Sequence, residues 1–256
     1  MGKTRSAKWD DGEGPVHFTA RRCELLRSGP RRLNDKIEEV CRDQSGWAIC
    51  PVDPNRLLEF FPTLHLRSGY VMHAYQYASG GNGNAFVFVQ KAAEEFPAPQ
   101  AYGDIDSDDS DPPRPPNAAA KPLSTIELDG TAWSYISASI FAREFAEFGA
   151  MWHGIDWGDH KIVDGRPTHV PNSRGKTSRS MTQIQDGNGW TWHVAEPEDW
   201  RPTVWLTLNE VKVEFFSYTA QGSCRIEQHA DVFKGRNAEF HSETTIVASG
   251  PGGFVY

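Results

Sequence analysis

The length, composition and charge of the chain set the first limits on its function. Its 256 residues are 38% hydrophobic and 12% aromatic, which is typical of a folded globular protein and excludes an intrinsically disordered chain. The net charge of −8 argues against a dedicated binder of duplex DNA, because such proteins need a basic face to neutralise phosphates.

Cysteine content and hydropathy predict a soluble cytoplasmic protein. The four cysteines include no CxxC pair and are too few for a disulfide framework, so we expect buried thiols in a reducing compartment. No apolar run approaches the ~20 residues that span a bilayer, and the polar start of the chain lacks the apolar segment of a secretion signal. The cysteines are Cys23, Cys41, Cys50 and Cys224.

Residues 1–96 predict an α+β portion. Residues 16–26 favour a strand, and Pro30 begins a segment whose apolar residues recur at helical spacing as far as Cys41. A short strand follows at 46–50.

Two further elements complete this portion. Asp53 and Pro54 predict the start of a second helix, as its N-cap and its first helical residue. A hairpin follows, with strands at 70–78 and 85–89 around the glycine-rich turn at 80–84.

An acidic, proline-rich segment at 97–122 separates this portion from the rest of the chain. It contains five aspartates against two basic residues, and few apolar residues around which it could fold. We therefore expect a flexible linker or loop.

Residues 123–256 predict a long amphipathic helix near 131–149, followed by an antiparallel meander. Bulky apolar residues recur at helical spacing along the helix, and Gly149 ends it. The predicted fold is α+β, with a curved or partial-barrel antiparallel sheet and a few flanking helices, and we expect 123–256 to pack with 1–96 as one body. The strands of the meander are expected at 160–163, 190–194, 204–208, 211–218, 224–233 and 242–248.

The densest cluster of polar and aromatic residues directly follows the long helix, at 152–160. His153, Asp156 and His160 offer two imidazoles and a carboxylate there, and these groups can bind a divalent metal such as zinc. The spacing of the two histidines is not a standard zinc pattern. The alternative is a turn whose tryptophans pack into the core while its charged residues face water.

A second cluster follows from the alternation of residues along strand 224–233. Glu227, His229 and Asp231 share one face of this strand, which makes them candidate catalytic residues. The next strand carries His241, a further candidate metal ligand. A three-residue hairpin loop would pair His229 with His241 and gather the cluster, whereas a two-residue loop would disperse it. The alternative is a sheet with one solvated face.

Two further features are candidate binding elements. Trp190 and Trp192 share a strand face that can stack on a sugar or a base, although core packing explains them more simply. Arg174, Lys176 and Arg179 form a basic loop without an acidic residue, which can bind a phosphate or a nucleic-acid backbone, or can simply be solvated.

Two functions remain open on the sequence alone. The first is binding of a small molecule or a protein partner in an aromatic-lined concavity of the curved sheet. The second is a metal-assisted hydrolase, in which a histidine-bound metal activates water and Glu227 acts as general base. The irregular spacing of the metal ligands favours the first. A membrane-spanning segment is not expected, and nucleic acid is disfavoured as a partner despite the local basic loop.

Overall fold

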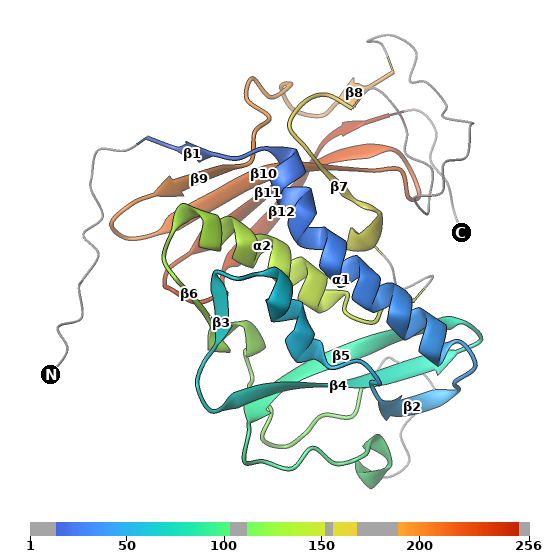
Figure 1. Ribbon diagram of the computed structural model, residues 1–256. Helices are drawn as coiled ribbons and strands as arrows, with labels where there is room; N and C mark the ends of the chain where they lie inside the picture. The colour runs from blue at the N-terminus through green and yellow to red at the C-terminus, as the bar shows by residue number, and fades with distance from the viewer. Residues whose placement is uncertain (1–13, 103–111, 152–155, 168–188, 251–256) are drawn as a thin grey trace, which may run out of the picture.

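The protein has an α+β fold built on a curled antiparallel sheet, which confirms the predicted fold class (Figure 1). The computed structural model describes residues 14–102, 112–151, 156–167 and 189–250. The strand order is β1-β9-β10-β11-β12-β8, and β7 pairs with β10 as well. The strands are β1 (Val16–His17), β7 (Lys161–Val163), β8 (Thr191–Trp192), β9 (Thr203–Leu206), β10 (Val211–Thr219), β11 (Arg225–Phe233) and β12 (His241–Ser249).

Two helices lie side by side between this sheet and a smaller one (Figure 1). They are α1 (Ala20–Cys41) and α2 (Ala132–Ala146), the second of which is the long helix predicted from the sequence. All residues from Ser134 to Ala142 are buried, because α2 contacts strands of both sheets.

The smaller sheet consists of β2 (Gly46–Ile49), β4 (Tyr70–Ser79) and β5 (Asn82–Lys91), in the order β2-β4-β5. The predicted hairpin is confirmed, but its turn is shorter than predicted, because β5 already begins at Asn82. Its turn is formed by Gly80 and Gly81, which both have positive φ, as the tight turn between twisted strands requires.

Short elements connect the two sheets. β3 (Leu64–Leu66) pairs with β6 (Ile126–Leu128). The predicted second helix is the 3-10 helix η1 (Pro54–Phe60), and the Asp53 side chain caps it by accepting a backbone N–H.

The predicted strand at 16–26 is wrong beyond His17. Helix α1 already begins at Ala20, because Thr19 is an extended N-cap whose hydroxyl accepts a backbone N–H of the first turn. Pro30 lies inside the helix and removes one hydrogen-bond donor. The apolar residues on both sides of Pro30 pack into the core, so tertiary packing outweighs the local preference.

The described ends of the acidic, proline-rich segment pack against the smaller sheet, while 103–111 lie outside the described residues. The carbonyl of Pro97 accepts the hydroxyl of Tyr75 (2.8 Å). On the other side of the gap, the Ala119 N–H donates to the carbonyl of Val89 (2.7 Å). The 3-10 helices of these ends are η2 (Pro99–Tyr102) and η3 (Pro122–Thr125).

One continuous apolar core includes residues from both halves of the chain. All four cysteines are buried free thiols, as predicted. A bilayer span needs a helix of about 20 apolar residues, and no helix in the described ranges meets that requirement.

Candidate metal centre

The candidate site is built on the face of β10 and β11 that the helices cover. Glu227, His229 and Asp231 alternate along β11 and are 8%, 4% and 0% exposed. Phe215 and Ser217 lie opposite His229 and Glu227 on β10. The predicted alternation is confirmed, and this face of the sheet is buried beneath the helices rather than solvated.

A turn that follows α2 brings His160 to the same face. The turn contains the 3-10 helix η5 (Trp157–Asp159) and leads into β7. His160 is 3% exposed. Its Nδ1 lies 2.9 Å from Ser217 Oγ, and this oxygen lies 2.7 Å from His229 Nε2. A single hydroxyl group is therefore hydrogen-bonded to two imidazoles.

Glu227 adds a carboxylate to the two imidazoles. Its Oε2 lies 3.8 Å from His160 Nδ1 and 4.0 Å from His229 Nε2. One ligand atom from each of these three residues lies within 4.8 Å of the other two. Arg225 Nε donates to the second carboxylate oxygen, Oε1, and so orients Oε2 toward the imidazoles. His160, Glu227 and His229 form the candidate metal centre.

Each imidazole also has an oxygen beside its second ring nitrogen. His160 Nε2 lies 3.7 Å from Asp156 Oδ1, and His229 Nδ1 lies 3.3 Å from Thr244 Oγ1. Metal-ligating histidines almost always have such a partner, because it fixes the orientation of the ring. The neighbouring His160 holds the pKa of Asp156 below its usual range.

Aromatic rings support the two imidazoles. Trp157 stacks on His160 with 5.5 Å between ring centroids, and Phe215 stacks on His229 at 4.8 Å. Burial, reinforced by the positive charge of Arg143, lowers the pKa of His229 well below its usual value. His229 is therefore neutral at pH 7, and a neutral ring nitrogen can ligate a metal ion.

A buried arginine fixes the turn that carries His160. Arg27 of α1 is fully buried, and its Nε donates to Glu144 Oε1 of α2 (2.7 Å). Its other nitrogens donate to the backbone carbonyls of Trp157 and His160. The Trp157 indole N–H donates to the same Glu144 oxygen (2.9 Å). Charge-assisted hydrogen bonds thus join both helices to the turn.

A second carboxylate of the α2 end holds the start of this turn. Glu147 accepts the backbone N–H groups of Asp156, Trp157 and Gly158. Burial raises the pKa of Glu147 to about 7, although the three donors favour its charged form. The position of His160 therefore depends on contacts from both helices.

Comparison with known proteins does not place the chain in a family. No protein-family model, curated protein or solved structure matches it. The chemistry of the site is therefore argued from its ligand types and geometry.

Asp231 shares the face of the centre but has other partners. Arg143 donates to both of its carboxylate oxygens, at 2.7 and 3.1 Å, and Ser242 Oγ donates to Oδ1 at 2.6 Å. This carboxylate is part of a buried ion pair that joins α2 to the sheet.

The register of β11 and β12 separates His241 from the centre. His229 pairs with Thr244, which places His241 on the opposite face, with its side chain 75% exposed. Neither hairpin register expected from the sequence occurs. The connection runs through 234–240, and its backbone is hydrogen-bonded to β6, so it is longer than either predicted loop.

The remaining predicted residues lie elsewhere. Trp190 is 8% exposed and meets Tyr218 edge-on, and Trp192 meets Trp200 edge-on. Trp190 belongs to a second apolar cluster, on the sheet face opposite to the metal centre, and Trp192 packs against this cluster. Four predicted residues lie outside the described ranges, namely His153, Arg174, Lys176 and Arg179.

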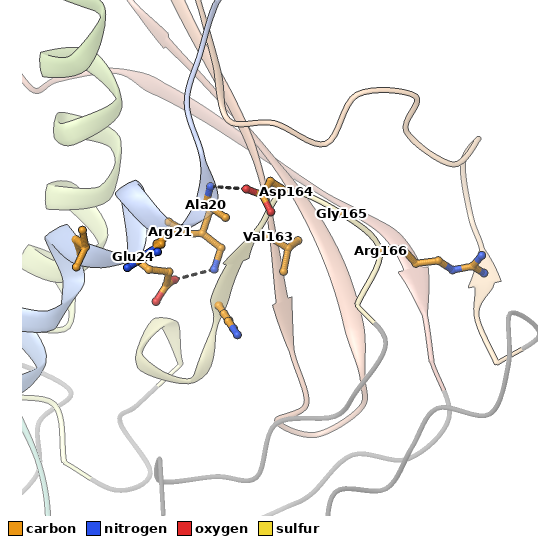
Figure 2. Close-up of a pocket in the computed structure, with 10 residues that line it drawn as sticks. Ala20, Arg21, Glu24, Val163, Asp164, Gly165 and Arg166 are labelled. Carbon is orange, nitrogen blue, oxygen red and sulfur yellow. Dashed lines mark hydrogen bonds between the residues drawn. The ribbon is translucent and has the colours of Figure 1, made fainter. Parts of the chain in front are cut away.

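An open hollow of about 590 Å³ lies between the start of α1 and β7 (Figure 2). Asp164 accepts the backbone N–H of Ala20 there (2.9 Å), and Glu24 accepts that of Ile162 (2.8 Å). None of the three candidate metal ligands lines it, so it is a separate feature.

Three supporting residues of the centre are absent from the sequence-based prediction. Ser217 could have been recognised from the sequence, because it is a polar residue on the strand face that also carries the apolar Val213 and Phe215. Arg27 lies beyond the expected strand, and Thr244 can be placed only once the register is known.

Proposed function

We propose that the protein binds one divalent transition-metal ion, such as zinc, through His160, Glu227 and His229, and uses it to hydrolyse a substrate. The proposal depends on one observation: ligand atoms from two separate segments of the chain converge within 4.8 Å in a buried setting. Two imidazoles and one carboxylate are a known ligand set of catalytic zinc sites, which keep a further position for water.

The chemistry would require a base close to the metal-bound water. Glu227 was the expected base, but here it is better suited to be a ligand, because its Oε2 faces both imidazoles. Asp156 lies beside His160, its side chain is 73% exposed and its pKa is lowered. It is therefore charged at neutral pH, but it lies beside the His160 nitrogen that faces away from the other two ligands, so it would orient this ring. The proton of a water that a metal has acidified would pass to solvent.

This function is favoured over ligand binding in an aromatic concavity. Trp190 is packed against core residues, and Trp192 packs against Trp200. By contrast, aromatic rings stack on His160 and His229, Thr244 is a second hydrogen-bond partner of His229, and the Asp156 carboxylate lies 3.7 Å from the second ring nitrogen of His160.

The first experiment is a zinc titration of protein that has been treated with a chelator. We expect one equivalent to bind, and His160→Ala and His229→Ala to weaken binding at least about 100-fold, which is the upper end of the loss seen for second-shell changes. The matched control is His241→Ala, because this exposed histidine lies on the opposite face of the neighbouring strand.

A wild-type protein that binds neither zinc, cobalt, manganese nor iron would refute the metal centre. So would an equal loss of affinity in the His241→Ala control. The hydrolytic part is tested separately, by assaying the zinc-loaded protein on p-nitrophenyl acetate and p-nitrophenyl phosphate. Asp156→Asn should weaken zinc binding about 10- to 100-fold, because it removes the outer partner of His160. A hydrolysis rate no higher than that of free zinc would contradict hydrolysis.

A further inference from the structure

Strand β12 presents a long edge that no described residue covers. It pairs with β11 along its length, but on its other side β8 pairs only with Ala248 and Ser249, and His193 donates one further bond to Val247. All six residues from His241 to Ile246 are exposed. Their outward-facing backbone groups therefore lack a strand partner within the described ranges.

Other strand edges in the described structure are short or covered. The β5 edge is bonded by Ala119 and bridged by Met151, and β1 is two residues long. Proteins also protect exposed edges with lysine or proline. The stretch 241–249 contains neither residue. A β-bulge at Val247 interrupts the strand only at the end that β8 and His193 already cover. The edge from 241 to 246 is therefore a template for another strand.

We infer that β12 pairs with β12 of a second copy, in a symmetric antiparallel dimer whose two sheets become continuous. The dyad of such a dimer is perpendicular to the sheet, so residues directly opposite each other point to the same side. Successive side chains alternate in direction. The residue at the dyad must therefore lie opposite its own copy in the partner subunit, and not opposite the copy of the next residue along the strand.

The uncovered stretch allows two central positions. A dyad at Glu243 would place it directly opposite Glu243 of the partner subunit, and like charges in that arrangement are destabilising. A dyad at Thr244 pairs Thr244 with the partner's Thr244, and threonine pairs are favourable. It also sets Glu243 opposite the partner's Thr245, and Ser242 opposite the partner's Ile246. The self-complementary register is therefore the one centred on Thr244.

The dimer would connect to the interior of each subunit. Thr244 lies 3.3 Å from His229 Nδ1, and Ser242 donates to Asp231. A partner strand would order the two residues of β12 that support the buried face of β11. The dimer does not require a bound metal ion.

Charge substitutions at position 245 test the register. Thr245 is exposed. In the dimer each Thr245 lies opposite Glu243 of the partner subunit, so the interface contains this pair twice. Thr245→Glu should weaken the dimer and Thr245→Lys should strengthen it, each about 2- to 30-fold, since two cross-strand pairs change. Sedimentation velocity over a wide range of concentrations measures both, and circular dichroism checks that the variants fold.

Crosslinking provides an independent measurement. A mixture of Glu243→Cys and Thr245→Cys proteins should form a covalent dimer on mild oxidation, because directly opposed strand residues satisfy disulfide distances. Neither protein alone should do so, and the native cysteines are buried. A wild-type protein that stays monomeric at every concentration would overturn the inference. A dimer whose dissociation constant is the same in the wild type, Thr245→Glu and Thr245→Lys would also overturn it.

Discussion

Replacing Arg27 with methionine tests whether the buried ion pair holds the turn of His160. The guanidinium is fully buried, and its removal leaves Glu144 without its nearest cation (2.7 Å) and deprives two backbone carbonyls of a donor. Breaking a buried ion pair on one side costs about 3–5 kcal/mol. Because Glu144 keeps the Trp157 indole as a donor, we expect Arg27→Met to fall near the lower end of this range.

The free energy of unfolding is measured by urea titration of metal-free protein, with tryptophan fluorescence as the signal. Arg56→Met is the matched control, since Arg56 and Glu59 form an exposed pair at 3.8 Å; it should change stability by at most about 0.5 kcal/mol. The double variant with Glu144→Leu should be more stable than the sum of the two single changes predicts. A loss below about 1 kcal/mol for Arg27→Met would refute the reasoning.

Two further predictions concern pH and backbone geometry. The folded-state pKa of His229 is lowered, so the contribution of His229 to the stability of metal-free protein should be complete above pH 6.5 and fall by up to about 1.4 kcal/mol per pH unit below it, because the unfolded chain then takes up the proton. Glu147, whose pKa is raised from 4.5 to about 7, gives a slope of the opposite sign between these two values. The test is therefore the difference between proteins: below pH 6.5 the wild type should lose more stability than His229→Gln with falling pH, and equal slopes would contradict the assignment. Gly149→Ala should destabilise more than Gly222→Ala in thermal unfolding, because both have positive φ but only at Gly149 would a Cβ lie 2.5 Å from that of Ala85; equal losses would contradict this packing.

The alternation of residues predicted one face of the candidate site correctly. Glu227, His229 and Asp231 follow a period of two, and that period survives in any strand whatever its neighbours are. Which strand lies alongside is a different matter. The connection at 234–240 forms hydrogen bonds with β6, a strand more than a hundred positions earlier in the chain, and this decides that Thr244 rather than His241 lies opposite His229.

The position of His160 could not be derived from local sequence for a similar reason. Its turn is held by Arg27 from α1 and by Glu144 and Glu147 from α2. The sequence-based prediction assigned Arg27 to the region just beyond a strand, so no helix was expected to carry it there. Long-range contacts of buried charged groups leave no periodic signal.

The single hydroxyl between the two imidazoles has a consequence for how a metal enters. Ser217 has one proton to donate, so it can donate to only one ring nitrogen and must accept from the other. In the metal-free protein, of the two ring nitrogens that face Ser217, one therefore carries a proton and the other does not. Both must present a bare nitrogen to an ion, so one ring must first move its proton to the far nitrogen, beside Asp156 or Thr244. Metal uptake should then be accelerated by proton-carrying buffers.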